Sequence, residues 1–385
     1  MKRIKAHKLI YLVTFILAGF LTSCGEEGIN NIQSNDPQFN MDKFEENLRA
    51  SLDGATVGYV YAINLNGQLN RSGDSGFART SLDGQILQSA SKRMNIASIT
   101  KTITAVAVLQ LLERRNLTID SLIAPWLPPD WSLGTGVSSL TFKSLLTHRT
   151  GFNTANSNFN ATLSFNALRD SVATGCINPQ SHLYMNMNYA LFRVIIPALW
   201  KGLPGAPGIS EINASSATFF YRLYIQQEIF DKLGVLNADC VSPSGEQPTL
   251  FYTNAANTPG VDYGDWTLIC GGGGYYLSAI DLANFLANIR YNNNILSAVN
   301  SDIMRNNYIG WSELGTLNGE HGEYFNHGGS INSTGPAGGN QGNMRGLIVQ
   351  FPNNVDLAVM TNSEIGAADL SIRTIVLNAY DNAWE

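Results

Sequence analysis

The sequence is poor in histidine, cysteine and charged residues. Its five histidines are scattered along 385 residues and its four cysteines show no metal-ligand spacing, so we expect no metal site. Only 14% of the residues are charged, and the net charge is −6. Because the sequence shows no basic patch that could bind nucleic acid, we expect no nucleic-acid partner.

The first 24 residues have the features of a secretion signal. Four cations and no acid precede an apolar run at residues 9–21, and thirteen residues are too few to span a bilayer. The run ends in Leu-Thr-Ser-Cys at residues 21–24, which resembles the bacterial lipoprotein cleavage box, in which the cysteine becomes the lipidated first residue. We therefore expect a lipoprotein signal peptide at residues 1–24 with lipidation at Cys24; the alternative is an ordinary cleavage site with a cysteine nearby by chance.

This leader predicts an exported protein that is lipid-anchored to the bacterial cell envelope, on its periplasmic or outer surface. Residues 25–41 are polar and rich in Asn, Gln and Glu, as expected of a flexible tether between anchor and domain. We expect one domain at residues 42–385, large enough for a sizeable core and opening with a short amphipathic helix at residues 42–52. A strand at residues 57–63 follows, and Asn66-Gly67 is a hairpin signal before a second strand.

The most informative stretch lies at residues 95–112. From residue 99 to residue 112 nearly every position is Ile, Val, Leu, Ala or Thr, which predicts a helix buried inside the domain. Lys101 falls in its first turn, where the helix dipole disfavours a cation, and Ser98 lies one turn earlier on the same face. Stability alone does not explain that lysine.

The pair fits an activated serine. An alcohol needs a nearby base and donors that hold an oxyanion, and a lysine on a buried helix can be that base if desolvation lowers its pKa. The backbone N–H of Ser98 at the helix mouth could hold the oxyanion. Ser-x-x-Lys also occurs at Ser89 and Lys92, but only Ser98 opens an apolar helix. The alternative is that Ser98 caps the helix and Lys101 is solvated.

A second stretch, Leu-Leu-Thr-His-Arg-Thr-Gly at residues 145–151, makes a family resemblance visible. Together with residues 95–128 it resembles the serine β-lactamase-related family, which includes class C β-lactamases, D-alanyl-D-alanine peptidases and several esterases. The resemblance implies an α/β (α+β) fold with an antiparallel sheet flanked by N- and C-terminal helices. It also implies a mainly helical subdomain, here about residues 115–265. His148 is expected to be structural.

The family's second element, Tyr-x-Asn, fits Tyr184 and Asn186. Tyr184 is selected by its place on a polar loop before an amphipathic helix predicted at residues 189–199. By the resemblance, Tyr184 relays protons with Lys101, and Asn186 orients the substrate amide or Lys101. The alternative is an interface tyrosine whose hydroxyl is hydrogen-bonded. Four other tyrosines also have Asn two residues on: Tyr252, Tyr291, Tyr324 and Tyr380.

The third element, Lys/His-x-Gly, fits His327-Gly328-Gly329. It precedes strands predicted at residues 347–351 and 357–361 and a helix predicted at residues 367–383. By analogy this strand lies against the substrate and Ser330 supplies the second oxyanion N–H. A histidine in place of the lactamase lysine is largely neutral at pH 7 and holds a carboxylate less firmly, which counts against β-lactam hydrolysis as the physiological role.

Another match to this element, residues 232–234, ends a helix predicted at residues 217–233, where a lysine and a glycine are expected as a cap. Residues 270–283 resemble the family's Gly-rich segment that leads through a serine cap into a helix. No Lys-Ser/Thr follows the glycines, so phosphate binding is a poor alternative and we expect no cofactor.

Cys176, Cys240 and Cys270 remain after Cys24; two could form a disulfide, but the sequence does not say which.

These observations predict a serine hydrolase whose partner is a small-molecule or peptide substrate. Ser98 attacks an amide or ester, Lys101 and Tyr184 handle the proton, and water releases the acyl group. The substrate is expected to be a D-amino-acid peptide or related ester, or a β-lactam, since these activities differ in the pocket and not in the nucleophile. The alternative is a catalytically inactive envelope lipoprotein that binds cell-wall peptides.

Overall fold

The computed structural model describes residues 37–385 apart from 154–162, 178, 246, 254–257, 313–316 and 335–340. The predicted signal peptide, Cys24 and the tether up to residue 36 lie outside the described residues. The chain divides into two units, Met1–Gln38 and Phe39–Glu385, and every described helix and strand belongs to the second. None of the helices in this described part is long and apolar enough to cross a membrane.

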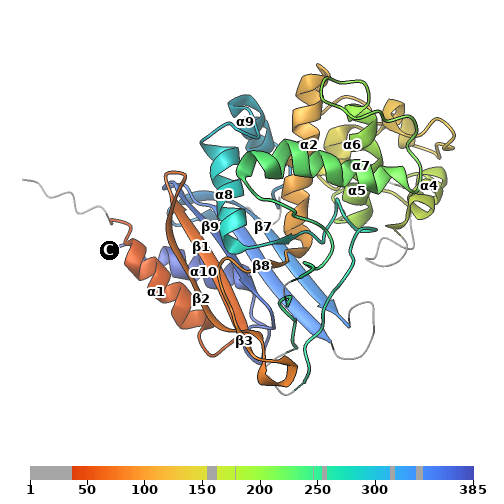
Figure 1. The fold of residues 1–385 in the computed structure, drawn as a ribbon. Helices are drawn as coiled ribbons and strands as arrows, with labels where there is room; N and C mark the ends of the chain where they lie inside the picture. Colours follow the sequence, from red (N-terminus) through yellow and green to blue (C-terminus); the bar gives the residue numbers. More distant parts are fainter. Residues whose placement is uncertain are drawn as a thin grey trace, which may run out of the picture. The chain divides into compact units, whose positions relative to one another are not determined.

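A seven-stranded antiparallel sheet forms the centre of the second unit (Figure 1). Its strand order is β3-β2-β1-β9-β8-β7-β6, so the first and last long strands pair with each other in the middle. Two further short strands, β4 and β5, pair beside it. The strands are β1 Gly58–Leu65, β2 Gln68–Arg79, β3 Ile86–Leu87, β4 Met94–Asn95, β5 Tyr276–Leu277, β6 Leu317–Gly319, β7 Gly322–Ser333, β8 Gly342–Gln350 and β9 Val355–Thr361.

The hairpin signal is found where the sequence places it. Asn66 and Gly67 join β1 to β2, both with positive φ, 52° and 74°. Such a turn matches the twist of the two strands, and Asn and Gly are the residues that adopt it at little cost. β1 is buried along nearly its whole length because β2 and β9 cover its edges and helices cover both of its faces.

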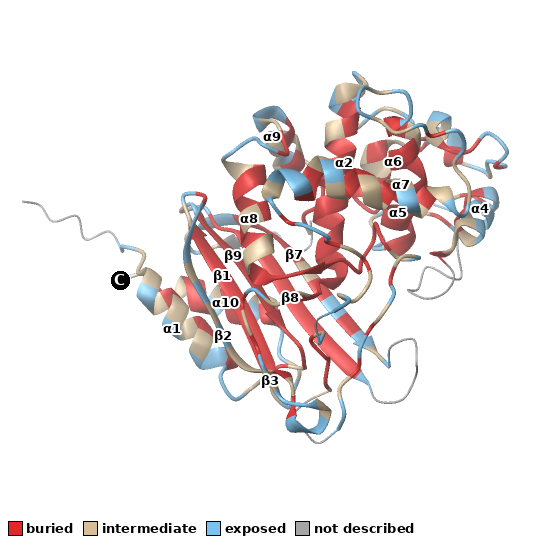
Figure 2. Cartoon of the chain, in the orientation of Figure 1, coloured by how far each residue is buried: buried red, intermediate tan, exposed pale blue. Residues whose placement is uncertain are grey.

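Two apolar layers sandwich the sheet. One face packs against α1 (Met41–Leu52) and α10 (Ile372–Asp381), with Phe44, Leu48 and Val376 fully buried between them. The other face packs against α8 (Ala279–Arg290) and the helical part of the chain. Figure 2 shows the resulting buried band through the inner strands and α2. The predicted antiparallel sheet flanked by terminal helices is confirmed.

The helical part surrounds α2 (Thr100–Arg114), of which all but three residues are buried. α2 ends at Arg114, and Asn116 shortly after it has a φ of 56°, a left-handed conformation typical of the residue that follows a helix. α7 runs on through a π turn, Gln226–Phe230, and a 3₁₀ turn, Asp231–Leu233, to Gly234. The remaining helices are α3 Phe142–Leu146, α4 Phe165–Thr174, α5 Asn186–Ala190, α6 Phe192–Trp200, α7 Ser216–Ile225 and α9 Ala298–Asn306.

Two helix predictions need correction. The amphipathic helix expected at residues 189–199 begins at Asn186 and is interrupted at Leu191, and α6 is buried on nearly every side because it packs against both α2 and α7. The helix expected at residues 367–383 spans only Ile372–Asp381. Residues 365–370 form turns instead, in which Asp369 has a φ of 46° and its carboxylate pairs with Arg345.

Candidate active site

Ser98 lies in a single 3₁₀ turn, Ala97–Ile99, that leads directly into α2. Ala97 has a φ of 50°, a conformation that is costly for a residue with a side chain. The Oδ1 atom of Asn95 accepts the Ala97 N–H at 2.9 Å and helps hold this turn. Ser98 is buried, with an exposed fraction of 8%, and it lines a cavity.

Lys101 is fully buried one turn later. Its Nζ lies 3.1 Å from Ser98 Oγ and 2.8 Å from Asn186 Oδ1, and it also bonds to the carbonyl oxygen of Gly272. Among the described residues no carboxylate contacts it. Burial lowers the pKa of Lys101 well below its ordinary value, because no anion compensates the desolvated charge. A neutral amine with a free electron pair is the form expected of a base.

Tyr184 approaches Ser98 from the loop that precedes α5. Its hydroxyl lies 2.9 Å from Ser98 Oγ, and Lys101 Nζ is 4.9 Å from the centre of its ring. Tyr184 is 47% exposed, yet burial around its hydroxyl raises its pKa to about 12. The phenol therefore keeps its proton at neutral pH.

His148 fixes the loop on both sides of Tyr184. Its carbonyl oxygen accepts the Leu183 N–H at 2.9 Å, and its Nδ1 accepts the Met185 N–H at 3.2 Å. The His148 and Tyr184 rings lie 4.4 Å apart. Burial, with Lys101 nearby, lowers the pKa of His148 well below its usual range, so the ring is neutral. These contacts agree with a structural role.

β7 closes the other side of the site. Ser312 N–H donates to Asn326 O at 2.8 Å, so Asn326 turns its backbone groups toward the outer edge of β7, away from β8. Along an antiparallel strand, the N–H and C=O groups of successive residues point alternately to one edge and the other. Gly328 and Ser330, two and four residues after Asn326, therefore present their N–H groups to the same edge as Asn326. Gly329 lies against the 3₁₀ turn: a Cβ atom there would be 2.5 Å from Ile96 O. β7 can approach Ser98 because this position lacks a side chain.

His327 lines the cavity but carries no charge. Its Nδ1 lies 3.0 Å from Gly310 O, and since a carbonyl only accepts, Nδ1 must hold the hydrogen. Burial and the nearby Lys101 lower the pKa of His327 to about 3. The ring is therefore neutral, as predicted from its reference pKa.

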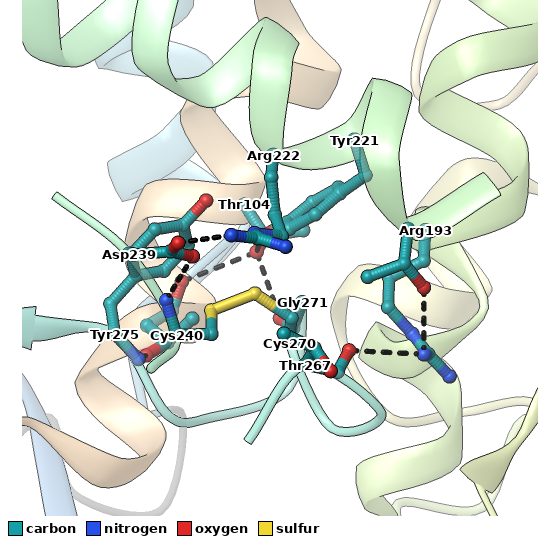
Figure 3. Close-up of a disulfide and its surroundings, with 12 residues drawn as sticks. Thr104, Arg193, Tyr221, Arg222, Asp239, Cys240, Thr267, Cys270, Gly271 and Tyr275 are labelled. Atoms are coloured by element: carbon teal, nitrogen blue, oxygen red, sulfur yellow. Dashed lines mark hydrogen bonds and ion pairs between the residues drawn. A yellow bond between two sulfur atoms is a disulfide. The ribbon is translucent and has the colours of Figure 1, made fainter. Parts of the chain in front are cut away.

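The Gly-rich segment supplies a group that the sequence analysis missed. Gly272 O is the third partner of Lys101, and Gly271 O accepts a hydrogen bond from Thr104 at 2.8 Å. Figure 3 shows the disulfide that precedes these glycines and joins Cys240 to Cys270. Cys176 is left as the free cysteine of the described chain. The glycine run itself was the only signal, because its position against α2 is a tertiary contact.

A cavity of about 560 Å³ lies beside Ser98. The described residues around it include the predicted site residues Ser98, Tyr184, Asn186, His327, Gly328, Gly329 and Ser330. Lys101 lies beneath them and donates a hydrogen bond to Asn186. Lys232, from the other match to the third element, does not line this cavity; its Nζ pairs with Glu228 at 2.8 Å. In the part of the chain that is described, no group of His, Cys, Asp or Glu side chains is arranged to hold a metal.

Two arginines that the sequence analysis did not single out also line the cavity. Arg345 is paired with Asp369 and donates to Ser330 Oγ at 3.2 Å. The Nε of Arg373, near the start of α10, donates to Asn326 Oδ1 at 3.1 Å. No described carboxylate pairs with Arg373, and burial lowers its pKa. The cavity thus contains one cation whose charge no described neighbour neutralises.

Comparison with known proteins identifies the fold. The family model described as Beta-lactamase matches residues 41–375. No curated protein matches the sequence. A solved octameric penicillin-binding protein homologue from Pyrococcus abyssi is similar, with 19% identity, 88% of this chain and 75% of that chain covered, and a TM-score of 0.64.

Two further solved structures are similar to the same extent. A D-amino acid amidase from Ochrobactrum anthropi SV3 has 18% identity, 88% and 99% of the two chains covered, and a TM-score of 0.64. A β-lactamase/D-alanine carboxypeptidase from Yersinia pestis has 14% identity, 89% and 97% covered, and a TM-score of 0.64. At these identities the likeness establishes a shared fold.

Proposed function

Because this chain belongs to the Beta-lactamase family, we propose that it is a serine hydrolase in which Ser98 forms an acyl-enzyme with an amide or ester substrate. One observation carries the proposal: Ser98 Oγ lies 3.1 Å from a buried lysine with no contacting carboxylate and 2.9 Å from the hydroxyl of Tyr184. A surface that only binds peptides has no need of a desolvated base beside a serine.

The contacts of Lys101 support its proposed role as the base. A neutral amine has two N–H bonds and one electron pair. If the N–H bonds point to Asn186 Oδ1 and Gly272 O, the electron pair is left facing Ser98 Oγ. Lys101 then takes the Ser98 proton as Oγ bonds to the substrate carbonyl carbon.

The remaining groups complete the acyl transfer. We assign stabilisation of the oxyanion to the backbone N–H of Ser98 and the edge-facing N–H of Ser330. Tyr184, protonated at neutral pH, passes its proton to the leaving group and is restored by the proton that Lys101 took. Attack of water on the Ser98 ester then releases the acid and regenerates the hydroxyl.

We propose a D-amino-acid peptide or a related ester as the substrate. His327 is neutral and cannot pair with a carboxylate, whereas Arg373 carries an unneutralised charge in the same cavity. A peptide with a free C-terminal carboxylate would satisfy Arg373. Among the structures with this fold, one is a D-amino acid amidase and one a D-alanine carboxypeptidase.

We also propose that the domain works in the cell envelope, anchored through Cys24. The leader pattern supports this, and a disulfide is typical of oxidising compartments. Expression in a bacterium followed by fractionation tests it. The full chain should pellet with the membrane and Cys24→Ala should not; equal membrane partition of both chains would contradict the anchor.

Intact-mass analysis of residues 25–385 after exposure to a fluorophosphonate, and separately to a penicillin, tests the enzymatic proposal. The fluorophosphonate adduct should disappear in Ser98→Ala and persist in Ser89→Ala, the matched variant in the other Ser-x-x-Lys motif. A persistent penicillin adduct would indicate a peptidase-like site with slow deacylation. No adduct with either reagent would refute the hydrolase and favour the peptide-binding lipoprotein.

A further inference from the structure

The glycine run that contacts Lys101 has no side chains to hold it in place and relies on backbone groups: the Gly272 and Gly273 N–H groups donate to Ile269 O, and Gly271 O accepts from Thr104. Residues 271–274 are four consecutive glycines, and Gly271 and Gly274 have φ values of 102° and 107°. Glycine has the greatest backbone freedom of all residues, so such a run has a high entropy cost of ordering. Position 271 has no room for a side chain, because a Cβ atom at Gly271 would be 2.8 Å from Tyr189 O.

The disulfide joins this run to a well-ordered part of the fold. Cys270 directly precedes Gly271, and its partner Cys240 is fully buried. Asp239, next to Cys240, pairs with Arg222 of α7 and accepts the Cys240 N–H at 2.6 Å on its side chain. Trp266 N–H also donates to Cys240 O at 2.7 Å. Figure 3 shows this chain of contacts from α7 through the disulfide to Gly271.

We infer that the Cys240–Cys270 disulfide is a positioning device for Lys101, because it fixes the glycine run so that Gly272 O orients the lysine toward Ser98. This inference rests on the proposed function of Ser98. Neither cysteine touches the substrate cavity, and the disulfide acts only through the run that follows Cys270. Without it, the run depends on its hydrogen bonds to Ile269 and Thr104, so the Gly272 carbonyl is less firmly fixed and water gains easier access to Lys101.

Two consequences follow for the reaction of Ser98. Misplacement of a base by about 1 Å costs on the order of a hundredfold in rate, so removing the disulfide should slow acylation roughly ten- to hundredfold. Burial is also the cause of the lowered pKa of Lys101. A loosened run therefore raises that pKa and moves the acid limb of the pH–rate profile to higher pH.

The experiment measures the rate of fluorophosphonate labelling of Ser98 against pH, with the melting temperature of each variant. Cys240→Ala/Cys270→Ala is compared with Cys176→Ala, which keeps the disulfide, and with Leu48→Ala, which weakens the apolar layer on the opposite face of the sheet. The double variant should label more slowly with a shifted acid limb. Cys176→Ala should match the wild-type chain, and Leu48→Ala should melt earlier with its profile unshifted.

A double variant with the wild-type rate and profile, or with no more change than Leu48→Ala, would overturn the inference alone. If the wild-type chain is not labelled at Ser98, the proposed function falls and this inference with it. Should the double variant not fold, Thr104→Val makes the test with the disulfide intact, since it removes the hydrogen bond from α2 to Gly271 O, along with the one between Thr104 and the Tyr221 hydroxyl. An unshifted profile in Thr104→Val would then overturn the positioning role of the run.

Discussion

Replacing Gly329 with alanine should separate β7 from Ser98. The added Cβ atom would lie 2.5 Å from Ile96 O and 3.2 Å from Ala97 Cβ, both part of the segment that carries Ser98. An ordinary contact requires the two backbones to move apart by roughly 0.5–1 Å. Since Gly329 does not have a positive φ, alanine adopts its backbone conformation without strain and the contact alone is responsible.

Two measurable losses follow from this movement. Overpacking of this size costs about 1–3 kcal/mol in the free energy of unfolding. The Ser330 N–H moves away from the oxyanion together with β7, which should slow fluorophosphonate labelling of Ser98 roughly ten- to hundredfold. Urea unfolding and labelling kinetics on the same preparation give both quantities.

Gly328→Ala is the matched control for stability. Its added Cβ atom would meet nothing closer than Gly346 O at 3.7 Å, an ordinary contact, so its free energy of unfolding should stay within about 0.5 kcal/mol of the wild-type value. If Gly329→Ala is as stable as Gly328→Ala and is labelled at the wild-type rate, β7 does not depend on this close approach and the reasoning is refuted.

Three further predictions concern the basic side chains of the site. Lys101→Met should slow labelling of Ser98 roughly 10²–10⁴-fold, and Lys101→Arg should not restore it because a guanidinium stays protonated; labelling in Lys101→Met at the wild-type rate would exclude the lysine as base. Folded Lys101 releases its proton well below pH 10.5, where the unfolded chain still holds it, so the free energy of unfolding should rise with pH across that window. Chemical denaturation at several pH values should show a smaller rise in Lys101→Met, and equal slopes would contradict the lowered pKa. Arg373→Ala should raise KM about ten- to hundredfold for a peptide with a free C-terminal carboxylate and leave KM for its amide unchanged, since a charged hydrogen bond contributes about 1.5–3 kcal/mol; equal effects on both would remove Arg373 from substrate recognition.

The local features of this fold could be predicted from the sequence because local interactions determine them. The Asn66-Gly67 turn and the buried helix after Ser98 depend on residues a few positions apart, and both lie where expected. The helix predicted to begin at residue 367 begins at Ile372 instead. A tertiary ion pair between Arg345 and Asp369 holds the preceding turn there, and no local pattern indicates that pair.

The site was predictable in its side chains but not in its backbone groups. The structure brings Ser98, Lys101, Tyr184 and Asn186 into hydrogen-bond contact. The Gly272 carbonyl, however, comes from a residue far along the chain and has no side chain to mark it. Arg373 likewise reaches the cavity only because α10 packs against β8, which brings Arg373 to Asn326 of β7. The pairing of Cys240 with Cys270 could be chosen only after the distance between them was known.

The central pairing of β1 with β9 determines when the site of a newly made chain can assemble. Tyr59 pairs with Thr361, so the middle of the sheet forms only after the last strand has been synthesised. Contacts between residues so distant in sequence slow folding, and one edge of β1 stays unpaired until β9 has been synthesised. Ser98 and Ser330 are brought together by the same closure. A growing or truncated chain that lacks β9 therefore carries Ser98 but no assembled site, and the hydrolysis that we propose would begin only with the complete sheet.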